Sequence, residues 1–141
     1  MRQLLLLTDD NFLSEVLGTY VRRDGIEIVR VPTASEAACE IVGGAAGVLV
    51  DIAKRGLAGA DVIGLSQRAA RARIPLFVLS SQARRDLSEF AAVVRAADVI
   101  SKSEQMTAIA ARLRLWMNGQ LADDEEQVDG FAIPELAVAS A

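Results

Sequence analysis

Five short strand-like runs alternate with stretches of helical periodicity, and this alternation constrains the fold more than any other feature of the sequence. The runs are Leu4–Leu7, Ile26–Val31, Gly47–Val50, Ile74–Leu79 and Val99–Ile100. Short apolar or β-branched runs that end at polar residues or glycine are typical of buried strands. Because a helical pattern follows each run, the sequence predicts five successive strand–helix units.

The helical stretches have apolar stripes and recognisable ends. We expect helices over residues 11–23, 35–42, 60–73, 87–94 and 106–119. In the first, Phe12 and its neighbour Leu13 both begin stripes at helical spacing. Thr33 or Ser35 is placed to cap the second, and Gly119 is expected to end the fifth. Cys39 lies among alanines in the second helix, where we expect it in the core.

Buried strands interleaved with amphipathic helices indicate an α/β fold. We predict a doubly wound, flavodoxin-like parallel sheet of five strands in the order 2-1-3-4-5, with helices on both faces. In such sheets ligands bind outside the carboxyl ends of the strands. No glycine-rich phosphate-binding motif follows any strand, which argues against dinucleotide or triphosphate binding.

Composition narrows the possibilities further. The 141 residues are 52% apolar and carry a net charge of −4, so we expect one globular domain and no binding to nucleic acid. A single cysteine forms no internal disulfide, and the cytoplasm is the expected compartment. The absence of histidine excludes histidine-based catalysis, and no apolar stretch is long enough to predict a membrane span. We assign residues 1–119 to the domain and 120–141 to an acidic linker and tail.

Polar side chains follow four of the strands. They are Thr8, Asp9 and Asp10 after the first, Asp51 after the third, Ser80 after the fourth, and Ser101 and Lys102 after the fifth. In a 2-1-3-4-5 sheet these strand ends are neighbours, so three carboxylates, the hydroxyl of Ser80 and the ammonium group of Lys102 converge. Clustered carboxylates repel one another unless a hard cation such as Mg²⁺ lies among them. A carboxylate beside a metal can accept a phosphoryl group, so the set indicates reversible aspartyl phosphorylation.

This pattern resembles the receiver domain of bacterial two-component response regulators over about residues 3–118. The positions that carry the resemblance are Asp9, Asp10, Asp51, Gly59, Ser80 and Lys102. The resemblance implies that Asp51 is the phosphoacceptor, assisted by Ser80 and Lys102, and that a histidine kinase or phosphotransfer protein supplies the phosphoryl group. The ligands it implies for Mg²⁺ are Asp9, Asp10, Asp51 and the backbone carbonyl of Ala53.

Three positions depart from the family pattern. Arg55 stands where a proline is usual, and Val99 replaces the aromatic switch residue that is coupled to the hydroxyl of Ser80. Ser103 replaces the proline after Lys102, so we expect no cis peptide bond there.

Each site residue also has a structural alternative. Asp9 or Asp10 could cap the first helix, and Asp51 could be a turn residue. Lys54 is expected to be a solvated surface lysine. Lys102 could be one too, but the chain has only two lysines against thirteen arginines, so a lysine at this strand end favours a functional role.

The leading hypothesis is a phosphorylation-controlled switch rather than an enzyme. It would alter the face made by the fourth helix, the fifth strand and the fifth helix, whose mixed charges suit a salt-bridged homodimer or a solvated surface. The alternative is an atypical receiver that acts as a phosphorylation-independent interaction module, which the departures at Arg55, Val99 and Ser103 favour.

Overall fold

The computed structural model describes residues 1–82 and 84–128 and contains one five-stranded parallel sheet. The strands are β1 (Arg2–Leu7), β2 (Ile26–Val31), β3 (Gly47–Asp51), β4 (Leu76–Ser80) and β5 (Asp98–Ser101). The helices are α1 (Asn11–Arg22), α2 (Ala34–Val42), α3 (Gly59–Ala72), α4 (Ser88–Val94) and α5 (Met106–Val128), with the 3₁₀ turn η1 (Arg84–Leu87) before α4. The strand order is β2-β1-β3-β4-β5. The predicted fold class is therefore confirmed.

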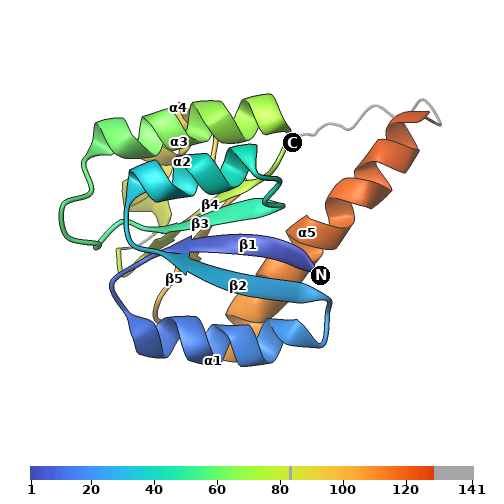
Figure 1. Ribbon diagram of the computed structural model, residues 1–141, viewed down its shortest axis with the longest axis horizontal. Helices are drawn as coiled ribbons and strands as arrows, with labels where there is room; N and C mark the ends of the chain where they lie inside the picture. Colours follow the sequence, from blue (N-terminus) through green and yellow to red (C-terminus); the bar gives the residue numbers. More distant parts are fainter. Residues whose placement is uncertain (83, 129–141) are drawn as a thin grey trace.

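Helices cover both faces of the sheet (Figure 1), with α1 and α5 on one face and α2, α3 and α4 on the other. Alternate residues of β1 point to the two layers: Leu4 and Leu6 pack toward α1 and α5, whereas Leu5 and Leu7 pack toward the other helices. All four leucines are fully buried. Burial of one such side chain contributes about 1.5–3 kcal/mol, which explains why the four buried positions Leu4–Leu7 of this strand are all apolar.

Strand pairing brings the carboxyl ends of β1, β3, β4 and β5 to one edge of the sheet. Leu7 pairs with Val50, Asp51 pairs with Leu79, and Ser80 pairs with Ser101. The polar residues that end or follow these strands therefore lie along the same edge, as the sequence predicts. This edge carries the candidate site.

Two details of the helices differ from the sequence-based expectation. The buried stripe of α1 starts at Leu13, while Phe12 is 72% exposed, because residues adjacent in a helix point about 100° apart and only one stripe can face the sheet. Cys39 is exposed, so its predicted burial is wrong; Ala37 and Ile41 form the buried face of α2 instead. The predicted cap of α2 is confirmed, since the hydroxyl of Thr33 accepts a hydrogen bond from an N–H of the first turn.

Helix α5 continues past the glycine that was expected to end it. Its backbone stays helical through Gly119 and the acidic residues that follow, to Val128. One glycine costs a helix only about 1 kcal/mol relative to alanine, and Leu121, Ala122 and the glutamates beyond it favour a helix. Residues 129–141, the rest of the expected tail, lie outside the described part of the chain. Within the described residues, no helix is long and apolar enough to cross a membrane.

Gly47 lets α5 approach the start of β3. A Cβ atom at this position would lie 2.9 Å from the sulfur of Met117 and 3.0 Å from a methyl group of Leu4, both of which are buried side chains. By contrast, a Cβ atom at Gly64, inside α3, would meet nothing within 4 Å. Substitution by alanine should therefore have opposite effects on stability at Gly47 and at Gly64.

We expect Gly47→Ala to lower the free energy of unfolding by about 1–2 kcal/mol, because the added methyl overpacks the α5 layer. Gly64→Ala should raise it by about 0.5–1 kcal/mol through helix propensity. Urea unfolding at neutral pH measures both. An increase in stability with Gly47→Ala would contradict the close packing of α5 on β3.

Candidate functional site

The carboxylate of Asp51 is the buried centre of the polar edge. Asp51 ends β3 and is 3% exposed. Its Oδ1 accepts a hydrogen bond from the N–H of Ala53 at 3.0 Å and lies 2.8 Å from Nζ of Lys102. Its Oδ2 accepts a hydrogen bond from the hydroxyl of Thr8 at 2.6 Å. Three chain segments thus supply donors to one carboxylate, which compensates the cost of burying its charge.

Lys102 reaches Asp51 because the pairing of β4 with β5 continues past the end of β5. The backbone N–H of Lys102 donates to the carbonyl of Ser80 at 2.8 Å, which fixes the lysine at this edge. No peptide bond among the described residues is cis, in agreement with the expectation for Ser103. Instead, the hydroxyl groups of Ser101 and Ser103 lie 2.7 Å apart and hold the turn after β5.

Asp9 and Asp10 have different environments although they are adjacent. Asp10 is the N-cap of α1, because its Oδ1 accepts a hydrogen bond from the N–H of Leu13 at 3.0 Å. Asp9 lies at the site, with its side chain 52% exposed. The capping alternative therefore describes the observed contact of Asp10 and not that of Asp9.

Thr8 lies beside Asp51, although no specific role was expected for it from the sequence. It is fully buried, donates to Asp51, and accepts a hydrogen bond from the N–H of Asp10 at 3.1 Å. The signal was present in the sequence, since Thr8 is the first polar residue after the leucines of β1. A residue directly after a buried strand can still be buried itself, and a buried polar group needs a partner.

Asp9 is held by the loop that follows β3. Its Oδ1 lies 3.2 Å from Nζ of Lys54, and its Oδ2 accepts a hydrogen bond from the N–H of Arg55 at 2.9 Å. The hydrogen bond from Arg55 and the contact with Lys54 lower the pKa of the Asp9 carboxyl below its usual value. The Lys54 side chain is only 12% exposed, so the expectation of a solvated lysine is wrong: its ammonium group is held by Asp9 and by the carbonyl of Arg55.

Ser80 ends β4 beside this centre. It is 2% exposed, and its hydroxyl oxygen accepts a hydrogen bond from the N–H of Gln82 at 2.9 Å. Val99, which stands at the position of the switch residue, is buried in the core on the α2–α4 side. The structure thus places Asp51 and Lys102 in direct contact, with Ser80 on the strand between them.

The donors at this edge suit a hard cation by their chemistry, but the expected set of three carboxylates is not assembled. Carboxylates of Asp9 and Asp51 and the carbonyl of Ala53 are the oxygen ligands that Mg²⁺ prefers. However, Asp10 is directed to α1 and Asp9 to Lys54. Across residues 1–82 and 84–128, no three His, Cys, Asp or Glu side chains are grouped so that they could hold a metal ion.

The charges on the α4–β5–α5 face are partly paired within the chain. Arg112 bridges Asp98 at 2.8 Å and Glu104 at 3.0 Å. The hydrogen bonds that the Arg112 guanidinium donates to Asp98 and to Glu104 raise its pKa above the usual value, although partial burial opposes this shift. The Arg112 side chain is 34% exposed, so the cluster stays accessible to a partner while its charges are already compensated.

Comparison with known proteins bears on the fold. No family model and no curated protein matches the sequence. Solved structures do match. A CheY-like receiver domain protein from Methanospirillum hungatei has 16% sequence identity and a TM-score of 0.73 over 87% of this chain and 98% of its own. The signal receiver domain of a putative LuxO repressor from Vibrio parahaemolyticus has 18% identity and a TM-score of 0.74 over 89% and 97%.

The chain has the fold of response-regulator receiver domains. A response regulator from Thermotoga maritima gives the same result, with 16% identity and a TM-score of 0.70 over 84% of this chain and 98% of its own. The resemblance inferred from the strand-end residues is therefore confirmed at the level of the fold. In this receiver fold, the candidate site lies at the carboxyl edge of the sheet.

Because Asp51 and Lys102 are in contact, substitutions at the two positions should have coupled effects on the free energy of unfolding. Lys102→Met should lower the free energy of unfolding by about 1–3 kcal/mol, because it leaves the buried Asp51 carboxylate without its counter-charge. In an Asp51→Asn background the same substitution should cost less than about 1 kcal/mol. Urea unfolding of the four proteins at pH 7 gives the coupling energy. Equal costs in the two backgrounds would show that the ion pair does not form in solution.

Proposed function

We propose that this chain is a signalling domain that accepts a phosphoryl group on Asp51 from a histidine kinase or a phosphotransfer protein. The observation that carries the proposal is the 2.8 Å contact between Asp51 Oδ1 and Lys102 Nζ at the carboxyl edge of a receiver fold. The chemistry requires a carboxylate nucleophile beside a fixed cation, and this pair supplies both. The domain is the recipient in this reaction rather than an enzyme that turns over a substrate.

In the transfer step, a carboxylate oxygen of Asp51 forms a bond to the phosphorus atom of a phosphoimidazole. The phosphorus–nitrogen bond breaks, and the imidazole leaves with the bonding electron pair. Lys102 offsets the charge that gathers on the phosphoryl oxygens, and the hydroxyl of Ser80 can donate a hydrogen bond to one of them. Since Thr8 and Ala53 already hold the carboxylate, little reorganisation is needed before the step.

The proposal also includes a Mg²⁺ ion that assists the transfer, which Asp9, Asp51 and the carbonyl of Ala53 would bind. Bound there, the ion would offset the negative charge of the incoming phosphoryl group. Asp10, which the sequence also suggested as a ligand, would have to give up its cap on α1 to take part.

The output of the switch would be a change in the α4–β5–α5 face. A phosphoryl group on Asp51 attracts the hydroxyl of Ser80, and the segment that joins β4 to α4 would follow it. Because Arg112 is already paired with Asp98 and Glu104, dimerisation through this face would need these charges to exchange partners or an apolar contact to form.

A second function is favoured by a specific observation. Lys54 already neutralises Asp9, and Val99 supplies no aromatic switch, so the domain could present one constant surface to a protein partner. This candidate is the phosphorylation-independent interaction module. It predicts that small phosphoryl donors leave the protein unmodified.

Wild-type protein incubated with acetyl phosphate and excess Mg²⁺ should gain the mass of one phosphoryl group, which is lost again in alkali as expected of an acyl phosphate. Asp51→Asn should gain none. Asp24→Asn, a matched change of an aspartate in the turn before β2 and so at the opposite edge of the sheet, should be modified like wild type. Intact-protein mass spectrometry reads all three. If wild type stays unmodified, or Asp51→Asn gains the same mass, the interaction module is the better account.

A further inference from the structure

Lys54 and Lys102 are the chain's only lysines, and the structure places both on carboxylates of this one edge. Lys102 lies beside Asp51, which is the arrangement proposed for phosphoryl acceptance. Lys54 has no role in that proposal. Nevertheless, its side chain is only 12% exposed, which is unusual for a lysine on a loop.

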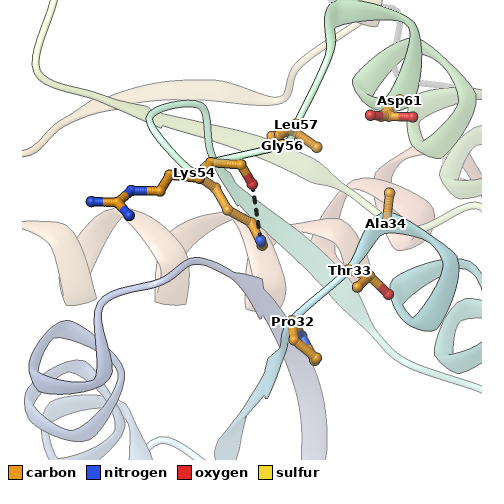
Figure 2. A pocket seen from close by; sticks show the side chains of 8 residues that line it. Pro32, Thr33, Ala34, Lys54, Gly56, Leu57 and Asp61 are labelled. Atoms are coloured by element: carbon orange, nitrogen blue, oxygen red, sulfur yellow. Dashed lines mark hydrogen bonds between the residues drawn. The ribbon is translucent and has the colours of Figure 1, made fainter.

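The ammonium group of Lys54 is held at two points. It lies 3.2 Å from Oδ1 of Asp9 and donates to the carbonyl of Arg55 at 3.2 Å. Figure 2 shows this hydrogen bond at the rim of a hollow that Thr33 and Asp61 also line. Because the loop also donates the N–H of Arg55 to the other oxygen of Asp9, both carboxylate oxygens already have a positively polarised partner.

We infer that Lys54 is a built-in counter-ion of Asp9 that competes with a divalent cation for the carboxyl edge of the sheet. This rests on the proposed function only in placing the cation at that site. An ammonium group on Asp9 supplies part of the charge compensation that a metal would supply, and it repels a second cation close by. Divalent cations bind here only when the Lys54 side chain moves away, so the position of this side chain sets their affinity.

The geometry allows this exchange because the two contacts of the Lys54 ammonium group, with Asp9 and with the carbonyl of Arg55, lie at the protein surface. Its partner Asp9 is 52% exposed, and the loop between β3 and α3 reverses at Gly56, whose φ is +76°. A four-carbon side chain on such a loop reorients without unfolding the sheet.

The test is calorimetric titration of the full chain with Mg²⁺ and no phosphoryl donor. Lys54→Met should bind Mg²⁺ about five- to tenfold more tightly than wild type, the gain expected when an ion pair of this exposure no longer competes. Arg55→Met is the matched control: it removes a neighbouring charge but keeps the backbone N–H that binds Asp9, and it should change the affinity by less than about twofold. Asp9→Asn added to Lys54→Met should abolish the gain.

An equal gain in Lys54→Met and Arg55→Met would overturn the inference, because general loop charge would then explain it. The inference would also be overturned if the gain in Mg²⁺ affinity persisted when Asp9→Asn was added, or if no variant bound Mg²⁺. If Lys54→Met unfolds, as judged by circular dichroism, Lys54→Gln carries the same test. Since no phosphoryl group is involved, the result is independent of whether Asp51 proves to be a phosphoacceptor.

Discussion

The buried carboxylate of Asp51 is the constraint on which the organisation of the site depends. A charge that is 3% exposed at the end of a central strand must be compensated within the protein. The compensation comes from Thr8 after β1, from the backbone of Ala53, and from Lys102 after β5. These segments are distant in sequence, so one carboxylate connects three strand ends that the sheet brings together.

The topology of the sheet is sufficient to bring these strand ends together. Parallel strands in the order β2-β1-β3-β4-β5 place their carboxyl ends on one edge, and helices on both faces bury the strands. Thr8, Asp51 and Ser80 are buried at those ends, where the sheet holds them on a rigid frame. The site's precision therefore comes from strand register, as the pairing of Asp51 with Leu79 and of Ser80 with Ser101 shows.

The sequence predicts this frame well because buried strands and helix stripes have short-range patterns. The fold class follows from that alternation, and the same-edge placement of Asp51 and Lys102 follows from the fold class. What the sequence could not predict depends on side-chain partners. The partial burial of Lys54 and the capping of α1 by Asp10 depend on which of several donors and acceptors pair, and the local sequence pattern does not determine this pairing. Cys39 and Phe12 show the same limit, since small rotations of a helix exchange a buried position for an exposed one.

Asp9 and Lys54 give the site a second level of control in this account. In the proposed mechanism the Asp51–Lys102 pair would prepare the nucleophile, and the Asp9–Lys54 pair would control access of a cation to the same edge. The two pairs share no residue, and each therefore has its own experimental readout.

The central claim is that Asp51 is the point at which a phosphoryl-like ligand enters the site and that Lys102 and Ser80 respond to it. Two-dimensional ¹H–¹⁵N NMR with beryllofluoride and excess Mg²⁺ tests this directly, because this anion mimics a phosphoryl group on a carboxylate. The account predicts that the amide signals of Ala53, Ser80 and Lys102 shift in wild type and stay unchanged in Asp51→Asn. Unchanged signals in wild type, or the same shifts in both proteins, would contradict it.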